Sequence, residues 1–425
     1  MSKMDWHEYE LENGTKLIYK KLSGFHSVAV GVFVKTGSRF EEREFAGISH
    51  FIEHLLFKGT KNRSCNEIKI AIEGVGGSFN GFTATEGTCY WIKILDEYLE
   101  LSFDILSDMI KNPLLKEEDI EKERNVIIEE INMYRDIPAK YVHELFDNLI
   151  FKDHPLGMPI SGTPETLLRI KREDLFNYIN TKYSAENIVV SVAGNFESKN
   201  LKKFFEKYFS DIQKRRENEF EKWEGKKEGP KVTLMTKETE QTHISFGGFA
   251  YSFEDDRKYP LSVLNVIIGG NMSSRLFNRI REELGLAYEI RSYVKGYKDT
   301  GIFNISAGVS PDNLEKVMIE IIKELREIKT NGVKEDEVER SKKFLISQFL
   351  MGLEDNLEYM FFIGEQKLLR DRMEKIKDIV GKIEKVKRED VNEIAKEIFN
   401  NENFYLAVIS PKGDEGKLKE IIGEI

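Results

Sequence analysis

The chain has 425 residues but only two cysteines, Cys65 and Cys89, which is too few for a disulfide framework. We therefore expect both to be free packing residues in a reducing compartment, which favours the cytoplasm. No hydrophobic run approaches the roughly 18 residues that a membrane span needs. The first residues contain no apolar core of a secretory signal. We accordingly expect neither a membrane anchor nor export.

Positive charge is not in excess either. Lys and Arg number 64 against 74 Asp and Glu, a formal net charge of −10, and no basic block stands out. This balance argues against a nucleic-acid partner. The composition is that of a folded globular protein, with 40% hydrophobic and 32% charged residues. At this length the chain can bury the cores of two or more domains.

Histidine is scarce too, and two of the seven histidines, His50 and His54, lie four residues apart. On a helix this spacing projects both imidazoles from one face, where they can bind one zinc ion. Glu53 lies beside the same stripe, where its carboxylate could accept a proton from a water on the metal. A lone histidine on an apolar helix is usually a core residue. The complete His-x-x-Glu-His pattern favours the metal site.

A helix predicted over 116–134 supplies the candidates for a third metal ligand. Charged helix residues usually face solvent, but the apolar residues between 126 and 131 indicate that much of this helix is buried. A buried carboxylate must be paired or bind a metal. Glu130 is the predicted third ligand. Glu123, seven residues earlier on the same face, is either a further ligand or a carboxylate that orients the site.

A glycine-bounded hairpin is predicted from strands over 78–85 and 88–94. Its first strand is expected at an exposed sheet edge, to which an extended peptide could add. An edge that is merely blunted is the equally open alternative. The candidate substrate-binding residues on this strand are Phe79, Asn80, Gly81, Phe82 and Thr83.

The sequence also repeats itself once. The tetrapeptide at 171–174, Lys-Arg-Glu-Asp, recurs 216 residues later at 387–390, and in both places a predicted strand follows. The acidic helix start at 116–122 has a counterpart 218 residues later, at 334–340. A single repeat of this length predicts two domains of the same fold.

The predicted domains are 1–212 and 231–425, joined by a charged linker over 213–230. The second domain has lost the metal motif. Aligning the two copies places Val263, Val266 and Ile267 at the positions of the motif residues, and Gln348 at the position of Glu130. We therefore expect the chemistry in the first domain.

The motif, together with a glutamate 76 residues after its second histidine, resembles the inverted-motif zinc peptidases of the pitrilysin family. The resemblance covers essentially the whole chain. It is greatest to the short branch that includes the mitochondrial processing peptidase β subunit and bacterial processing-protease-like enzymes. It implies one zinc ion per chain and assigns five residues: the ligands His50, His54 and Glu130, the catalytic base Glu53 and the auxiliary carboxylate Glu123.

In the second half, Arg281 and Tyr288 match the Arg-x(6)-Tyr pair of the same family, which is associated with holding the substrate backbone and stabilising the transition state. Without the resemblance, their ordinary interpretation is a surface ion pair and a core aromatic. The resemblance also implies an α+β fold. Each domain would be a mostly antiparallel sheet with helices packed on one face, and the pair would form a half-clamshell. A homodimer, or a heterodimer with a related chain, would complete the chamber, with Arg281 and Tyr288 acting in trans.

The predicted function is a zinc-dependent endopeptidase that cleaves unstructured peptides or presequence-like segments, held in extended form inside a closed chamber. The alternative is a non-catalytic subunit of the same fold that binds peptides or serves as a scaffold. Relatives of that kind lose motif residues, and this sequence retains them all.

Overall fold

The computed structural model describes residues 6–424, which divide into two compact units. Unit 1 is formed by the residues up to Ile131, Met158–Glu221 and Leu350–Lys375; unit 2 is formed by Asn132–Gly157, Lys222–Phe349 and the residues from Ile376 onward. The units are therefore not the contiguous ranges that the repeat suggests. Each unit contains one segment from the other half of the sequence.

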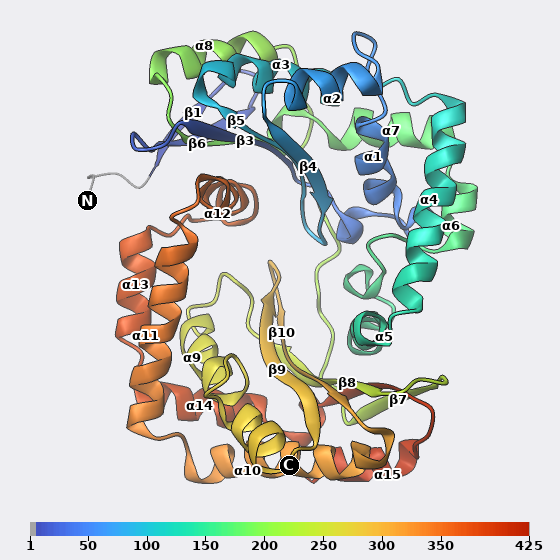
Figure 1. Ribbon diagram of the computed structural model, residues 1–425, viewed down its shortest axis with the longest axis vertical. Helices are drawn as coiled ribbons and strands as arrows, with labels where there is room; N and C mark the ends of the chain where they lie inside the picture. The colour runs from blue at the N-terminus through green and yellow to red at the C-terminus, as the bar shows by residue number, and fades with distance from the viewer. Residues whose placement is uncertain (1–5, 425) are drawn as a thin grey trace. The chain divides into compact units, whose positions relative to one another are not determined.

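Unit 1 contains a six-stranded sheet in the order β1-β2-β6-β3-β5-β4 (Figure 1). Every pair is antiparallel except β2 and β6, which are parallel. The predicted position of β4 at the sheet edge is confirmed. The strands are β1 (His7–Glu10), β2 (Lys16–Lys21), β3 (Ser27–Val34), β4 (Ser78–Thr83), β5 (Thr88–Leu95) and β6 (Ile188–Gly194).

One face of this sheet is covered by helices, because alternate strand residues such as Val28, Val30 and Val32 point into a single apolar core with them. The helices of unit 1 are α1 (Ile48–Leu56), α2 (Cys65–Glu73), α3 (Leu99–Lys111), α6 (Pro164–Arg169), α7 (Arg172–Lys182), α8 (Ser198–Phe209) and α12 (Asn356–Leu369). A further helix, α4 (Glu117–Arg135), begins in unit 1 and ends in unit 2.

The opposite face of the same sheet is covered by α12, although this helix comes from the second half of the sequence (Figure 1). Ser191 of β6 donates a hydrogen bond from Oγ to the Met360 carbonyl at 2.7 Å. Two glycines allow the close approach. A Cβ at Gly31 would lie 2.4 Å from Met360 Sδ, and one at Gly364 would lie 2.3 Å from the Phe33 ring.

Unit 2 has the same design, with a five-stranded sheet in the order β7-β11-β8-β10-β9. Only β7 and β11 are parallel. Its strands are β7 (Lys231–Thr236), β8 (Thr242–Ala250), β9 (Ala287–Gly296), β10 (Gly301–Val309) and β11 (Tyr405–Ser410). Its helices are α5 (Pro138–Phe151), α9 (Lys258–Ile268), α10 (Leu314–Asn331), α13 (Ile376–Glu384), α14 (Arg388–Ile398) and α15 (Glu415–Ile422), and α11 (Glu335–Gly352) begins in unit 2 and ends in unit 1.

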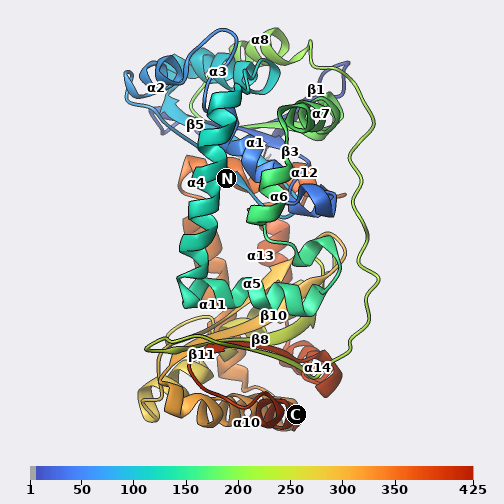
Figure 2. The same ribbon diagram turned by 90° about the vertical axis from the view of Figure 1, so that its right-hand side faces the viewer.

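Helix α5 plays in unit 2 the part that α12 plays in unit 1 (Figure 2). Its buried side chains, Val142, Phe146 and Ile150, join a separate apolar cluster with alternate residues of β11. The other face of β11 points into the main core of unit 2. Each sheet is thus covered on one face by several helices and on the other by one helix from the other half of the chain.

The repeated segments form the same elements in both units. The predicted acidic helix starts become α4 and α11, which begin at Glu117 and Glu335. The repeated tetrapeptides open α7 and α14, where Asp174 and Asp390 accept hydrogen bonds from the backbone amides of the lysines three residues earlier, at 2.8 and 2.9 Å. The chain is therefore an α+β protein of two similar units. Within residues 6–424, no helix combines the length and hydrophobicity needed to cross a membrane.

Candidate metal centre

The metal-motif helix, α1, is anchored by an unusual N-terminus. It follows Gly47, whose φ of 94° strongly favours glycine and which supplies no capping side chain. The cap comes instead from Glu41, whose carboxylate accepts hydrogen bonds from the amides of Gly47 at 2.7 Å and Ser49 at 2.8 Å. Burial of Glu41 nevertheless raises its pKa to about 7, because it outweighs these hydrogen bonds.

The three predicted metal ligands, His50, His54 and Glu130, lie together. Their candidate ligand atoms are all within 4.8 Å of one another, and no other such group of His, Cys, Asp or Glu occurs in residues 6–424. Oε2 of Glu130 is 3.9 Å from Nε2 of His50 and 3.7 Å from Nε2 of His54. Two atoms that each bind zinc at about 2.1 Å in tetrahedral geometry lie about 3.4 Å apart. The spacing and the two-His, one-carboxylate donor set therefore fit a zinc ion.

The electrostatic state of His50 suits a ligand. Burial, followed by the nearby His54, lowers the pKa of His50 to about 4. Its ring is therefore neutral at pH 7, with a nitrogen lone pair free to bind a cation. The other ring nitrogen, Nδ1, is buried and has no hydrogen-bond partner within the described part of the chain.

The orientation of His54 is set by Glu123, which belongs to α4. His54 Nδ1 lies 3.2 Å from Glu123 Oε2, within hydrogen-bond distance. Because a carboxylate can only accept, Nδ1 carries the proton, and the lone pair is left on Nε2, the nitrogen that faces Glu130. Of the two roles predicted for Glu123, this geometry matches the carboxylate that orients the site. On its far side, Glu123 Oε1 lies 2.5 Å from Lys58 Nζ.

Glu53, the predicted base, is on the same helix and only 8% exposed. Burial raises its pKa above the ordinary value of 4.5. Thr83 of the edge strand donates a hydrogen bond from Oγ1 to Glu53 Oε2 at 3.3 Å. A Cβ at Gly81 would lie 3.0 Å from Glu53 Oε1, so the glycine leaves room for this carboxylate.

The five candidate substrate-binding residues of β4 divide between the two faces of the strand. Phe79, Gly81 and Thr83 lie on the side of α1, where the Phe79 ring contacts Phe57 with centroids 5.7 Å apart. Phe82 points the other way, to Phe361 of α12 at 5.6 Å. The Asn80 side chain accepts a hydrogen bond from the next backbone amide. Their role in peptide binding stays a prediction.

Arg281 and Tyr288 belong to unit 2. Arg281 lies in a π-helical segment, Phe277–Glu283, and Tyr288 lies near the start of β9. The guanidinium is 5.6 Å from the Tyr288 ring centroid and 4.6 Å from that of Phe277. Tyr288 is 77% exposed, so it is not the core aromatic of the ordinary interpretation. The predicted catalytic role of the pair stays a prediction.

The residues that replace the metal motif in unit 2 are structural. Val263, Val266 and Ile267 are buried in α9, within or beside the core, and Gln348 lies on α11. The sequence alone did not identify Lys58 or Glu41 as part of the site. Lys58 carried one signal, since it lies four residues after His54. Glu41 carried none, because it reaches the helix from a separate segment.

Comparison with known proteins agrees with this division. The model of the insulinase family, peptidase family M16, matches residues 16–164, which contain the whole metal motif, Glu123 and Glu130. The model described as the M16 inactive domain matches residues 169–345. An uncharacterized zinc protease of Bacillus subtilis, YmxG, is 38% identical over 407 residues, which cover 96% of this chain and 98% of that protein. The chain belongs to peptidase family M16.

Other M16 relatives extend the picture. An uncharacterized zinc protease of Streptomyces coelicolor is 34% identical over 412 residues, covering 95% of this chain and 89% of that protein. The crystal structure of a protease from Helicobacter pylori superposes with a TM-score of 0.90 and covers 96% of this chain and 99% of its own. At 23% identity, that likeness shows the fold alone. The two relatives from Bacillus subtilis and Streptomyces coelicolor are thus named zinc proteases, and the likeness of fold extends over nearly the whole chain.

Proposed function

We propose that this chain is a zinc-dependent endopeptidase that cleaves unstructured peptides, or presequence-like segments, bound in extended form. The observation that carries the proposal is the convergence of His50, His54 and Glu130 beside the buried carboxylate of Glu53. These three residues would hold the ion. Zinc, when bound, would supply a Lewis acid that polarises the peptide carbonyl and lowers the pKa of water to about 7.

The protein's own part in the reaction is proton transfer by Glu53. Its raised pKa makes the carboxylate a better proton acceptor near neutral pH than an exposed glutamate. Glu53 would take the proton of the attacking water and then give it to the leaving amine. The hydrogen bond from Thr83 holds one of its oxygens and leaves the other for the proton.

The substrate would bind as an added strand at β4, which pairs on one side only, with β5. Main-chain hydrogen bonds would then supply most of the affinity, so we expect modest sequence selectivity. We further propose that Arg281 and Tyr288 contact the peptide backbone from a second copy of the chain, in a homodimer. A related chain in place of the second copy is the other outcome to be tested. Mixing Glu53→Gln with Arg281→Ala protein under conditions of subunit exchange should restore cleavage if the pair acts in trans.

The central test compares zinc content and cleavage of a quenched, unstructured peptide. Glu53→Gln should retain zinc and lose about 10²- to 10⁴-fold in cleavage rate. Glu130→Gln should lose zinc, whereas Glu129→Gln, a matched change at the exposed neighbouring position, should lose neither. A chelator should abolish wild-type cleavage, and added zinc should restore it. Zinc binding without cleavage, or cleavage that is indifferent to Glu53→Gln, would instead support a peptide-binding or scaffold subunit.

A further inference from the structure

The contacts of Lys58 extend the metal centre by one residue. Lys58 lies two positions beyond the end of α1, and its Nζ is 2.5 Å from Glu123 Oε1. The other oxygen of the same carboxylate contacts Nδ1 of His54 at 3.2 Å. A chain of contacts therefore leads from the Lys58 ammonium through the Glu123 carboxylate to the His54 ring, whose Nε2 faces Glu130.

Glu123 depends on Lys58 because it is buried. Its side chain is only 9% exposed, and within residues 6–424 its polar contacts are His54 and Lys58 alone. A buried carboxylate that loses its cationic partner is stabilised by turning toward water. This movement would weaken the hydrogen bond that holds His54 in the tautomer a metal ligand needs.

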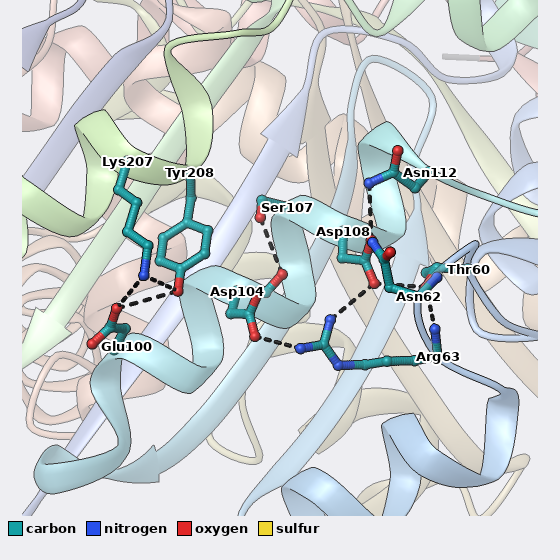
Figure 3. A network of polar contacts seen from close by, with 10 residues as sticks. All are labelled: Thr60, Asn62, Arg63, Glu100, Asp104, Ser107, Asp108, Asn112, Lys207 and Tyr208. Atoms are coloured by element: carbon teal, nitrogen blue, oxygen red, sulfur yellow. Dashed lines mark hydrogen bonds and ion pairs between the residues drawn. The ribbon is translucent and has the colours of Figure 1, made fainter.

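The segment that follows Lys58, residues 60–63, is tied to α3 by a buried carboxylate (Figure 3). Asp108 of α3 accepts hydrogen bonds from Thr60 Oγ1 at 2.6 Å, Asn62 Nδ2 at 2.6 Å and Arg63 Nη1 at 2.9 Å. The Lys58 amide also donates to the Leu55 carbonyl at 3.0 Å, which continues the turn of α1. Hydrogen bonds thus hold the backbone at Lys58 and just after it.

We infer that Lys58 is a positioning residue of the metal centre, which acts on the metal through Glu123 and His54. The inference rests on the proposed function, since it assumes that the cluster binds zinc. Among the described residues, the Lys58 ammonium pairs with Glu123 and with none of the three predicted ligands. Its effect is to keep Glu123 directed at Nδ1 of His54, so that Nε2 is held where a cation is bound.

The test measures zinc affinity of the full chain by competition with a chromogenic chelator. Loss of a carboxylate that orients a zinc ligand typically costs about 10- to 100-fold in affinity, so we expect that range for Glu123→Gln. Lys58→Met acts one contact further away and should weaken zinc binding about 3- to 10-fold. Lys58→Arg, which can still pair with the carboxylate, should restore most of the affinity. Lys111→Met, which removes a lysine paired with Asp211 elsewhere in unit 1, is the matched control and should change nothing.

A double substitution separates positioning from general damage to the fold. If Lys58 acts through Glu123, then adding Lys58→Met to Glu123→Gln should change zinc affinity by less than about 2-fold. Additive losses would overturn the inference. Unchanged or tighter zinc binding by Lys58→Met alone would also overturn it, since the screened repulsion between the ammonium and the cation would then be the larger effect. If the wild type binds zinc but cleaves no peptide, the proposed function fails, and a zinc deficit in Lys58→Met would still support the inference.

Discussion

The cap on α1 leads to a prediction about stability that runs against intuition. The Glu41 carboxylate accepts two hydrogen bonds from backbone amides at the start of the metal-motif helix, so its removal would ordinarily be expected to destabilise the fold. However, burial raises the pKa of Glu41 from 4.5 to about 7. This rise corresponds to about 3 kcal/mol of preference for the protonated form in the folded state.

The sign follows from proton binding. Between pH 4.5 and about 7 the folded state keeps the Glu41 proton while the unfolded state releases it. The stabilising contribution of Glu41 is therefore fully present below pH 4.5 and is lost as the pH rises through about 7. Glu41→Gln is neutral at every pH and should escape this pH-dependent loss, although its amide nitrogen cannot accept one of the two backbone hydrogen bonds, which lowers its stability equally at every pH. As the pH rises from 5 to 8, the unfolding free energy of the variant should therefore rise by about 2 to 3 kcal/mol relative to that of the wild type.

The assay is urea unfolding followed by circular dichroism at pH 5, 6, 7 and 8. A chelator is included so that metal binding adds no pH dependence of its own. Glu44→Gln, at an exposed position close by in the sequence, removes the same charge and should show a difference from the wild type that is flat with pH. A variant at Glu41 that instead becomes less stable than the wild type as the pH rises would refute the reasoning. The two amide hydrogen bonds would then outweigh the cost of burying the charge.

Three further predictions concern the edge strand, the exchanged helix and the loop. Gly81→Val should cut the cleavage rate about 100-fold with zinc content unchanged, because its branched side chain enters the space of Glu53. Gly81→Ala needs a shift of only a few tenths of an ångström and should retain most activity. A normal cleavage rate for the valine variant would contradict this prediction. Phe146→Ala in α5 removes a buried ring and should lower the unfolding free energy, measured in urea, by about 3 to 5 kcal/mol. Asn148→Ala, at an exposed position of the same helix, should lower it by less than about 0.5 kcal/mol. Equal effects of the two substitutions would argue against the packing of α5. Asp108→Asn should cost about 1 to 2 kcal/mol at pH 7 in the same assay, and a cost that persists at low pH would count against its charge as the cause.

The expected pH dependence of Asp108 has a definite direction. Burial raises the pKa of this carboxyl, but hydrogen bonds from Thr60, Asn112, Asn62 and Arg63 outweigh it, so the net pKa lies below 3.8. Its stabilising contribution is present above pH 3.8 and is lost as the pH falls through the lower folded-state pKa. The difference between the wild type and Asp108→Asn should therefore shrink in acid.

Local features of the structure were predictable because they depend on neighbouring residues. The predicted strands over 78–85 and 88–94 correspond to β4 and β5, and the first of them lies at the sheet edge as expected. The metal cluster was predictable because helix periodicity fixes the spacing of His50 and His54, and because a glutamate among apolar residues needs a partner. The repeat predicted two copies of one fold without any knowledge of their contacts.

What could not be predicted are the contacts that join distant segments. No local pattern shows that Glu41 caps α1, because a buried acid and an exposed one look alike in sequence. Lys58 lies four residues after His54 but beyond the end of α1, so its spacing alone does not show that its side chain reaches Glu123 on a different helix. The covering of each sheet by α5 and α12 was missed for a similar reason. The amphipathic pattern of a helix shows that one of its faces is buried, but it does not show which sheet that face covers.

The exchange of these two helices offers a physical reason why a half without metal ligands is retained. The face of β3 and β6 that carries Phe33 and Ser191 is covered by α12, which lies beyond residue 350. A chain that ended after the first half would expose this face, together with Gly31, whose lack of a side chain makes room for the helix. In return, α5 from the first half covers the corresponding face of unit 2. Each half of the sequence needs a helix from the other half to cover its sheet, so the second half is required for the fold although it lacks the metal motif.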